Sequence, residues 1–234
     1  MKKCFVMNSS VVLFGLLVLS LSAANASLLP CTVSGANSGV DDPVVSTTVI
    51  TCGTLTFSNF DVPNATGGAS GLIDVLAGSD YDSVTGAVYL NFNPNLGANE
   101  DEQFLFEVSG GVSQIDMSIG GNNASVTERA CANPIVTSGA LAGLCTNSAG
   151  TVSETPLGQI TVASGEADQP VFSTPFTATS PVYIFKDIMT GADGQLSEFT
   201  QSFEPGSVPE PITMALLGSG LLCLGLLRRK SRRS

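Results

Sequence analysis

The chain has 234 residues, 43% of them hydrophobic, and a formal net charge of −11 at pH 7. It contains no histidine, which excludes a Ser-His-Asp hydrolase and a histidine-ligated zinc peptidase. It also has no tryptophan and only three tyrosines, so aromatic platforms for binding sugar rings are scarce. The composition therefore argues against an enzyme.

Residues 1–26 have the features of a secretion signal. Two lysines precede an apolar run from Val11 to Leu21, and Ala24-Asn25-Ala26 supplies the small residues after which signal peptidase cleaves. We therefore expect a signal helix that is cleaved off before Ser27. The alternative is an uncleaved membrane helix, but the apolar run is shorter than the roughly 20 residues that a span needs.

Residues 27–207 predict an exported domain with one antiparallel, jelly-roll-like β-sandwich. Short β-rich runs alternate with clusters of Gly, Asn, Asp, Pro and Ser, and about 180 residues suffice for one core. In the run from Gln103 to Val108, apolar residues alternate so that one face can be buried. The expected strands are 44–51, 53–60, 87–93, 102–109, 115–119, 151–154, 157–162, 171–178, 182–187 and 195–203.

The segment 122–150 interrupts this pattern. It is rich in small and polar residues and contains two cysteines, which predicts a disulfide-pinned loop or small subdomain. The alternative is a short helical patch, because Ala140-Leu141-Ala142-Gly143-Leu144 is compatible with one or two helical turns.

Four cysteines lie in the exported region: Cys31, Cys52, Cys131 and Cys145. An even number in an oxidising compartment predicts two disulfides. Three pairings are open, and we favour Cys31 with Cys52 and Cys131 with Cys145, because short loops close more easily. A zinc site is the alternative, but the chain has no histidine and no Cys-x-x-Cys pair.

The exported region is strongly acidic, with two basic and nineteen acidic residues and a formal charge of −17 between residues 27 and 207. Nucleic acid and anionic lipid are poor partners for such a surface, whereas divalent cations fit it. Carboxylates on expected loops are candidate calcium ligands, although they lack EF-hand spacing: Asp80, Asp82, Glu100, Asp101 and Glu102. The same residues, with Asp41 and Asp42, are the nearest candidates for a glycosidase pair. The alternative is a solvated surface that maintains solubility, and no other cofactor is expected.

Two triplets match the acceptor sequence for N-glycosylation. They are Asn64-Ala65-Thr66 and Asn123-Ala124-Ser125, both in turn-like contexts where a glycan could be carried. An Asn-, Ser- and Thr-rich chain contains such triplets by chance, so the sequence leaves modification open.

Residues 208–234 predict a membrane-anchoring tail. Val208-Pro209-Glu210-Pro211 precedes an apolar run from Ile212 to Leu227, which can form a transmembrane helix if snorkelling arginines extend its reach. Five basic residues follow it: Arg228, Arg229, Lys230, Arg232 and Arg233. By the positive-inside rule they stay cytoplasmic, and the preceding domain lies outside. An amphipathic soluble helix is the alternative, but no polar stripe interrupts the run.

The order of a Pro-Glu-Pro motif, a hydrophobic span and a terminal arginine cluster resembles the PEP-CTERM sorting signal. The resemblance implies a substrate of exosortase, a membrane protease or transpeptidase of bacteria that make extracellular polysaccharide. On that basis Pro209, Glu210 and Pro211 would be recognised, the span would hold the precursor, and the tail would be removed on release. No LPxTG-type sortase motif is present, and a glycolipid-anchor signal ends in its hydrophobic run.

Two segments of the exported domain, 55–60 and 181–188, also look like segments of other PEP-CTERM proteins. No activity of those proteins can be carried over to this chain. We expect a non-enzymatic surface or extracellular-matrix protein of structural or adhesive type, with exosortase, the secretion machinery, signal peptidase and extracellular polysaccharide as partners. It would be held transiently in the inner membrane and then sorted to the cell surface or matrix. The alternatives are a calcium- or carbohydrate-binding module and a secreted glycan-active enzyme that uses acidic residues.

Overall fold

The computed structural model describes residues 27–35, 44–63, 73–75, 78–152, 155–164 and 171–206. In this part of the chain the regular structure is all β, and no helix is long and apolar enough to cross a membrane. Every strand pairing is antiparallel, which confirms the predicted all-β, antiparallel character of the domain, while the predicted signal helix and transmembrane helix lie outside the described residues. The strands are β1 Leu28–Pro30, β2 Thr32–Ser34, β3 Val49–Cys52, β4 Leu55–Asp61, β5 Asp74–Val75, β6 Asp80–Asp82, β7 Val88–Asn93, β8 Asp101–Ser109, β9 Val112–Cys131, β10 Gly158–Ala163, β11 Val171–Phe172 and β12 Val182–Pro205.

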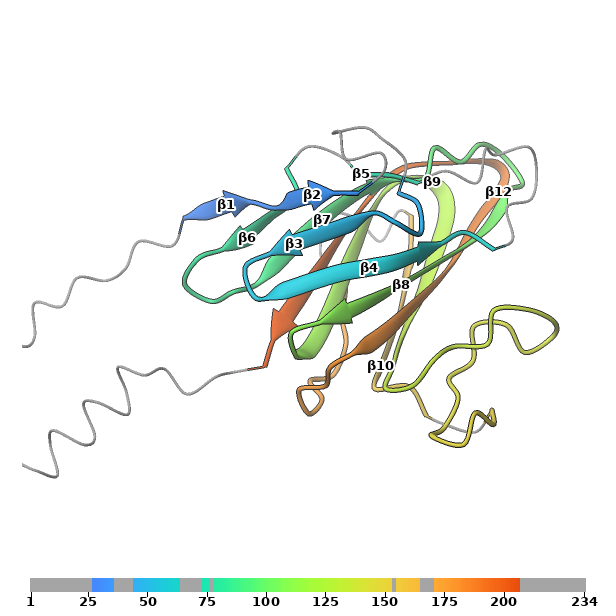
Figure 1. The fold of residues 1–234 in the computed structure, drawn as a ribbon. Coiled ribbons are helices and arrows are strands. Elements are labelled where there is room, and N and C mark those ends of the chain that lie inside the picture. The colour runs from blue at the N-terminus through green and yellow to red at the C-terminus, as the bar shows by residue number, and fades with distance from the viewer. Residues whose placement is uncertain are drawn as a thin grey trace, which may run out of the picture.

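The strand β12 is the centre of the sheet. Its first half pairs with β8 through Val182–Met189, and its second half pairs with β7 through Phe199–Phe203. Strand β9 accompanies it along both halves on the other side. Because β4, β3 and β2 continue from β8 while β6 and β1 continue from β7, the strands form a nearly closed sheet with two facing layers. Figure 1 shows β12 running to one end of the molecule, folding over and returning.

The bend in the two-stranded ribbon formed by β9 and β12 depends on glycines. The register between the two strands shifts between Thr190 and Gln195, which marks a bulged bend. There the backbones approach so closely that a Cβ on Gly121 would lie 2.2 Å from the carbonyl oxygen of Gln195. Similarly, a Cβ on Gly194 would lie 2.5 Å from the carbonyl oxygen of Asn123. Only glycine allows the ribbon to pass from one layer to the other here.

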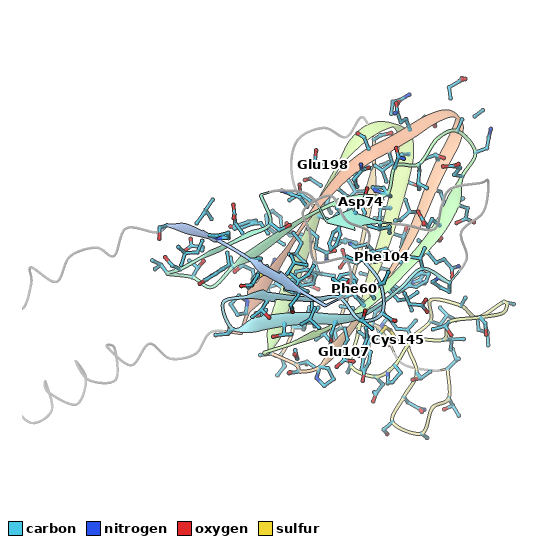
Figure 2. All side chains as sticks on the ribbon, turned by 45° about the horizontal axis from the view of Figure 1, so that its top comes forward. Phe60, Asp74, Phe104, Glu107, Cys145 and Glu198 are labelled. Atoms are coloured by element: carbon cyan, nitrogen blue, oxygen red, sulfur yellow. A yellow bond between two sulfur atoms is a disulfide. The ribbon has the colours of Figure 1, made fainter. Side chains whose placement is uncertain are left out.

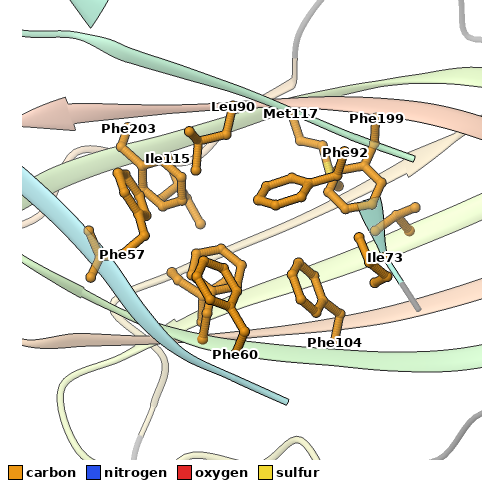
Figure 3. Close-up of a cluster of buried hydrophobic side chains, with 14 of the residues drawn as sticks. Phe57, Phe60, Ile73, Leu90, Phe92, Phe104, Ile115, Met117, Phe199 and Phe203 are labelled. Carbon is orange, nitrogen blue, oxygen red and sulfur yellow. The ribbon is translucent and has the colours of Figure 1, made fainter. Parts of the chain in front are cut away.

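Phenylalanine side chains fill the space between the layers. Phe57 on β4 lies 5.0 Å from Phe203 on β12, and Phe104 on β8 lies 5.3 Å from Phe92 on β7, measured between ring centroids. Figure 3 shows these rings converging from opposite layers. Phe60 also points inward, because Asn59 has a φ of 56° at a register shift in β4 and resets the alternation. Figure 2 shows Phe60 and Phe104 in the interior and Glu198 at the surface.

The predicted strands agree with the observed strands to different degrees. Those at 53–60, 87–93, 102–109 and 157–162 correspond to β4, β7, β8 and β10. The expected strand 115–119 is one part of the much longer β9, and 182–187 and 195–203 are halves of one β12. The expected strand 44–51 is reduced to β3, and 171–178 is reduced to β11. Of the expected strand 151–154, Val152 makes a single bridge to Thr146.

The segment 122–150 combines a strand and a loop. Its first ten residues belong to β9, because Gly120 to Cys131 pairs with β12. The remainder forms the predicted disulfide-pinned loop, and 140–144 contains turns rather than a helix. In these turns the Ala142 amide donates to Gly139 O at 3.1 Å and the Leu144 amide donates to Leu141 O at 3.2 Å.

Candidate functional site

Both ends of the described domain leave from the same end of the sandwich. The Ser27 hydroxyl lies 3.1 Å from that of Ser83 in the β6–β7 turn. Gly86 in the same turn lies against the ring of Pro205, and the Gly206 amide donates to Gly111 O at 2.9 Å. The signal peptide, the sorting motif, the apolar run 212–227 and the basic cluster 228–234 lie outside the described residues. The chain that carries the tail therefore begins at the end of the domain where its amino terminus also lies (Figure 1).

The two disulfides have the pairing that loop length favoured, with Cys31 joined to Cys52 and Cys131 joined to Cys145. Cys31 stands between β1 and β2, which pair with strands of opposite layers. Its disulfide therefore fixes the segment that closes one side of the sandwich. The second disulfide ties the end of β9 to the loop that follows it.

The structure gives two of the candidate calcium ligands local roles in loops. The Asp82 carboxylate accepts hydrogen bonds from the amides of Val84 and Thr85, at 2.7 and 3.1 Å. These bonds lower the pKa of Asp82 and close the β6–β7 turn. The Glu100 carboxylate accepts from the Gly97 amide at 2.6 Å. Among the residues that the structure describes, no three His, Cys, Asp or Glu side chains are grouped so that they could hold a metal ion.

Glu102 has a different environment from the other carboxylates at the start of β8. Its side chain is fully buried, and neither carboxylate oxygen has a hydrogen-bond partner within the described part of the chain. Burial, with a further contribution from the charge of Glu100, raises the pKa of Glu102 to about 7. Glu102 is therefore a core residue whose neutral form suits its surroundings.

Glu102 should make the stability of the domain depend on pH. Because its folded pKa of about 7 lies above the ordinary value of 4.5, its contribution is complete below pH 4.5 and is lost as pH rises through 7. The loss should reach about 3 kcal/mol in the free energy of unfolding. We expect Glu102→Gln to be more stable than the wild type at pH 8, with a smaller difference at pH 4, measured by urea denaturation.

The control for this prediction is Glu198→Gln, which changes an exposed carboxylate. It should leave the pH profile of stability unchanged. A parallel profile for the wild type and Glu102→Gln would show that Glu102 does not titrate in this range.

One of the two asparagines in the N-glycosylation triplets lies in the described part of the chain. Asn123 is exposed at the bend of β9 with a φ of 46°, and Gly191 lies against its side chain. Asn64 lies outside the described residues. Asn123 therefore stands at the end of the sandwich opposite the two chain ends.

A shallow depression lies on the outer face of the layer that contains β4 and β8. Its volume is about 220 Å³, and its wall includes Asn59, Glu107, Tyr183 and Ile135. The Asn59 side-chain amide donates to the Glu107 carboxylate at 2.9 Å. The depression thus combines aromatic residues, Tyr183 and Phe106, with polar side chains beneath the disulfide-pinned loop.

The interior holds a cluster of Lys186, Glu128 and Gln201, all with an exposed fraction of 0%. Lys186 Nζ lies 2.9 Å from Glu128 Oε2, and Gln201 Nε2 donates to Glu128 Oε1. Lys186 Nζ also lies 3.4 Å from Met117 Sδ and 4.9 Å from the centre of the Phe199 ring. An amine and a primary amide are thus held at the two oxygens of one carboxylate.

The strands determine how this cluster assembles. Lys186 and Glu128 are directly opposite each other in the β9–β12 pairing, in one layer. Gln201 lies in the second half of β12 opposite Met117, in the other layer. The bend in β12 therefore brings Lys186 and Gln201, from opposite halves of one strand, to the same Glu128 carboxylate.

Burial determines the ionisation of this cluster. Burial lowers the pKa of Lys186 and raises that of Glu128, although their mutual attraction acts in the opposite direction for each. Both shifts lower the free energy needed to convert the ion pair into a neutral amine and a neutral acid. A neutral amine is a nucleophile and a neutral carboxylic acid is a proton donor.

The cluster was not among the sites predicted from the sequence, although the sequence contains a signal for it. Glu128 follows Val126 and precedes Ala130, and all three face inward. Lys186 occupies the same kind of position between Ile184 and Ile188. A charged residue in an inward position of an alternating strand indicates a buried polar group that needs a partner.

One family model matches the chain, the PEP-CTERM protein-sorting motif, over residues 207–232. The match begins directly after the last described residue, Gly206, and includes the Pro-Glu-Pro motif, the apolar run and most of the basic cluster. No curated protein matches the chain. The predicted sorting motif at the carboxy terminus is therefore confirmed, and the match does not extend into the β domain.

Proposed function

We propose that this chain, which carries the PEP-CTERM sorting motif at its carboxy terminus, is an exported structural or adhesive protein of the bacterial surface or extracellular matrix. The observation that carries the proposal is the motif match over residues 207–232, directly after the domain ends. Such a motif supports export and processing by an exosortase. The role of the β domain in the matrix is an inference from its composition and chemistry.

The route begins with the general secretory machinery and signal peptidase. The amino-terminal signal helix directs export, and cleavage leaves Ser27 as the new terminus. The apolar run 212–227 then forms a transmembrane helix in the inner membrane, with its basic cluster in the cytoplasm. Two disulfides in the described domain agree with an oxidising compartment outside the cytoplasm. Exosortase removes the tail, and the domain passes to the cell surface or matrix.

The β domain acts without catalysis in this proposal. The chain has no histidine for general base chemistry, and the carboxylates of Asp82 and Glu100 close loops. The formal charge of −17 between residues 27 and 207 keeps the domain soluble beside other polyanions. A disulfide-stapled sandwich suits a passive extracellular component.

Intact-mass analysis of the protein from its native host tests the proposal. The unmodified protein should lack residues 1–26 and the terminal tail. A variant with Pro209→Ala and Pro211→Ala should lose only the signal peptide, because the recognition motif is changed while the span remains. Pro175→Ala, which changes an exposed loop proline, is the matched control and should be processed normally.

The opposite outcome is also informative. A complete carboxy terminus in the unmodified protein, recovered from the cell surface, would remove exosortase processing from the proposal.

Carbohydrate binding is the second candidate, and the depression around Tyr183 favours it. Calorimetry with extracellular polysaccharide and with calcium distinguishes the two roles. A passive structural domain should release no heat and show no shift in melting temperature with either ligand. Heat with polysaccharide that disappears in Tyr183→Ala would favour the binding module.

A further inference from the structure

The Lys186–Glu128–Gln201 cluster is unusual as a purely stabilising feature. A buried ion pair contributes little net stability, because the desolvation of both charges offsets their attraction. In addition, Gln201 Oε1 has no hydrogen-bond partner among the described residues. A buried amide oxygen without a partner costs stability. A contribution to stability therefore does not by itself explain why these three polar side chains are buried together.

We propose that Lys186 and Gln201 become joined by an intramolecular isopeptide bond, formed inside the folded domain with Glu128 as the proton carrier. The geometry supplies the three groups that this reaction needs. The amine of Lys186 and the side-chain amide of Gln201 lie at the two oxygens of the Glu128 carboxylate, and all three side chains are fully buried. No external reactant is required.

The first step is a proton transfer from the Lys186 ammonium to the Glu128 carboxylate, across the 2.9 Å that separate Nζ from Oε2. Burial favours this transfer, since it lowers the pKa of Lys186 and raises that of Glu128. A half-turn of the Gln201 amide brings Oε1 to the Glu128 carboxyl. The protonated carboxyl then donates to Oε1 and polarises the carbonyl carbon.

The second step joins the two side chains. Lys186 Nζ attacks Cδ of Gln201, forming a C–N bond, while the Glu128 carboxyl proton passes to Oε1. The Glu128 carboxylate then accepts a proton from Nζ and donates it to Nε2, the bond from Cδ to Nε2 breaks, and ammonia leaves. The proton on Oε1 returns to Glu128 as the carbonyl group re-forms. The products are a secondary amide between Lys186 and Gln201 and one molecule of ammonia. Atoms and charge balance, and nothing is oxidised or reduced.

The surroundings favour this bond over hydrolysis. The exposed fractions of Met117 and Phe199, which line the amine, are 0%, so bulk water is excluded from the reacting atoms. The β9–β12 pairing holds Lys186 beside Glu128, so the amine and the proton carrier are already positioned before the reaction and little entropy is lost in bringing them together. The product would tie the two layers together across the core.

The experiment uses the full-length protein, exported so that its disulfides form, and then denatured and reduced. A lysine-specific protease should fail to cut after Lys186, because the side chain is acylated. The peptide containing both residues should be lighter than its sequence by the mass of one ammonia molecule, with fragment spectra joining Lys186 to Gln201.

Two variants serve as comparison. Glu128→Gln keeps the size of the side chain but cannot carry the proton, so it should have the full mass and be cut after Lys186. Glu107→Gln, which changes a carboxylate on the outer face, should keep the cross-link. Because the decisive measurement is made on the wild type, it stands even if a variant fails to fold.

Two wild-type results would overturn the proposal. One is a full-mass protein that is cut after Lys186. The other is a protein lighter by one water molecule with Lys186 joined to Glu128, which would assign a different bond.

Discussion

Phe106→Ala should lower the free energy of unfolding of the domain by about 3–5 kcal/mol. The Phe106 ring lies between the two layers, with its centre 5.2 Å from that of Phe104 and 5.5 Å from that of Phe60. It also lies 6.0 Å from Phe203 in the opposite layer, so its removal opens a cavity that several rings line. Urea denaturation of the variant and the wild type measures the difference.

The matched control is Phe172→Ala. Phe172 on β11 has an exposed fraction of 57%, so the same truncation should change stability by no more than about 0.5 kcal/mol. An equal effect of the two substitutions would show that the phenylalanine cluster is not the core of the domain.

Replacing Cys31 and Cys52 together by Ala should cost about 3–4 kcal/mol. The disulfide spans 21 positions of the chain, and releasing such a loop adds conformational entropy to the unfolded state. Cys52 is also fully buried, so the substitution leaves a small cavity. Thermal and urea denaturation of the pure variant give the size of the loss.

The position of this disulfide predicts where the variant opens. Cys31 joins β1 to β2, so we expect faster amide hydrogen exchange in these two strands than in β8. Replacing Cys131 and Cys145 by Ala is the comparison, because that loop spans 14 positions and lies outside the β1–β2 segment. Faster exchange in β1 and β2 of that second variant would contradict the assignment.

The sequence predicted the strands whose own pattern determines burial. In β8, Phe104, Phe106 and Val108 alternate with less buried residues, and the structure buries all three. The pairing of the cysteines followed in the same way from the length of the loops that they close. In both cases, the information lies within a short stretch of the chain.

The strands that were not predicted from the sequence depend on pairing between residues far apart in the chain. The expected strand 115–119 stops before Gly120 and Gly121, yet both glycines are paired with β12, because the partner strand bends with them. Strands β1 and β2 have no buried alternation of their own, and their pairing depends on β6 and β3. A local pattern cannot show that a distant strand supplies the missing hydrogen bonds.

The candidate site shows the same limit. The inward positions of Lys186 and Glu128 are visible in the alternation of their strands. That Gln201 completes the cluster follows only from the bend that turns β12 back over the core. The carboxylates that the sequence grouped are instead divided between turns and the interior.

The central place of β12 has a consequence for the order of events during biosynthesis. Its residues 182–205 are near the carboxyl end of the described chain, yet they supply the pairing partners of β7, β8 and β9. A ribosome makes them after the rest of the domain, so neither layer can be completed while they are still missing. The polypeptide therefore stays open until late in synthesis, which suits a molecule that must thread through a narrow translocation channel before it acquires its final shape.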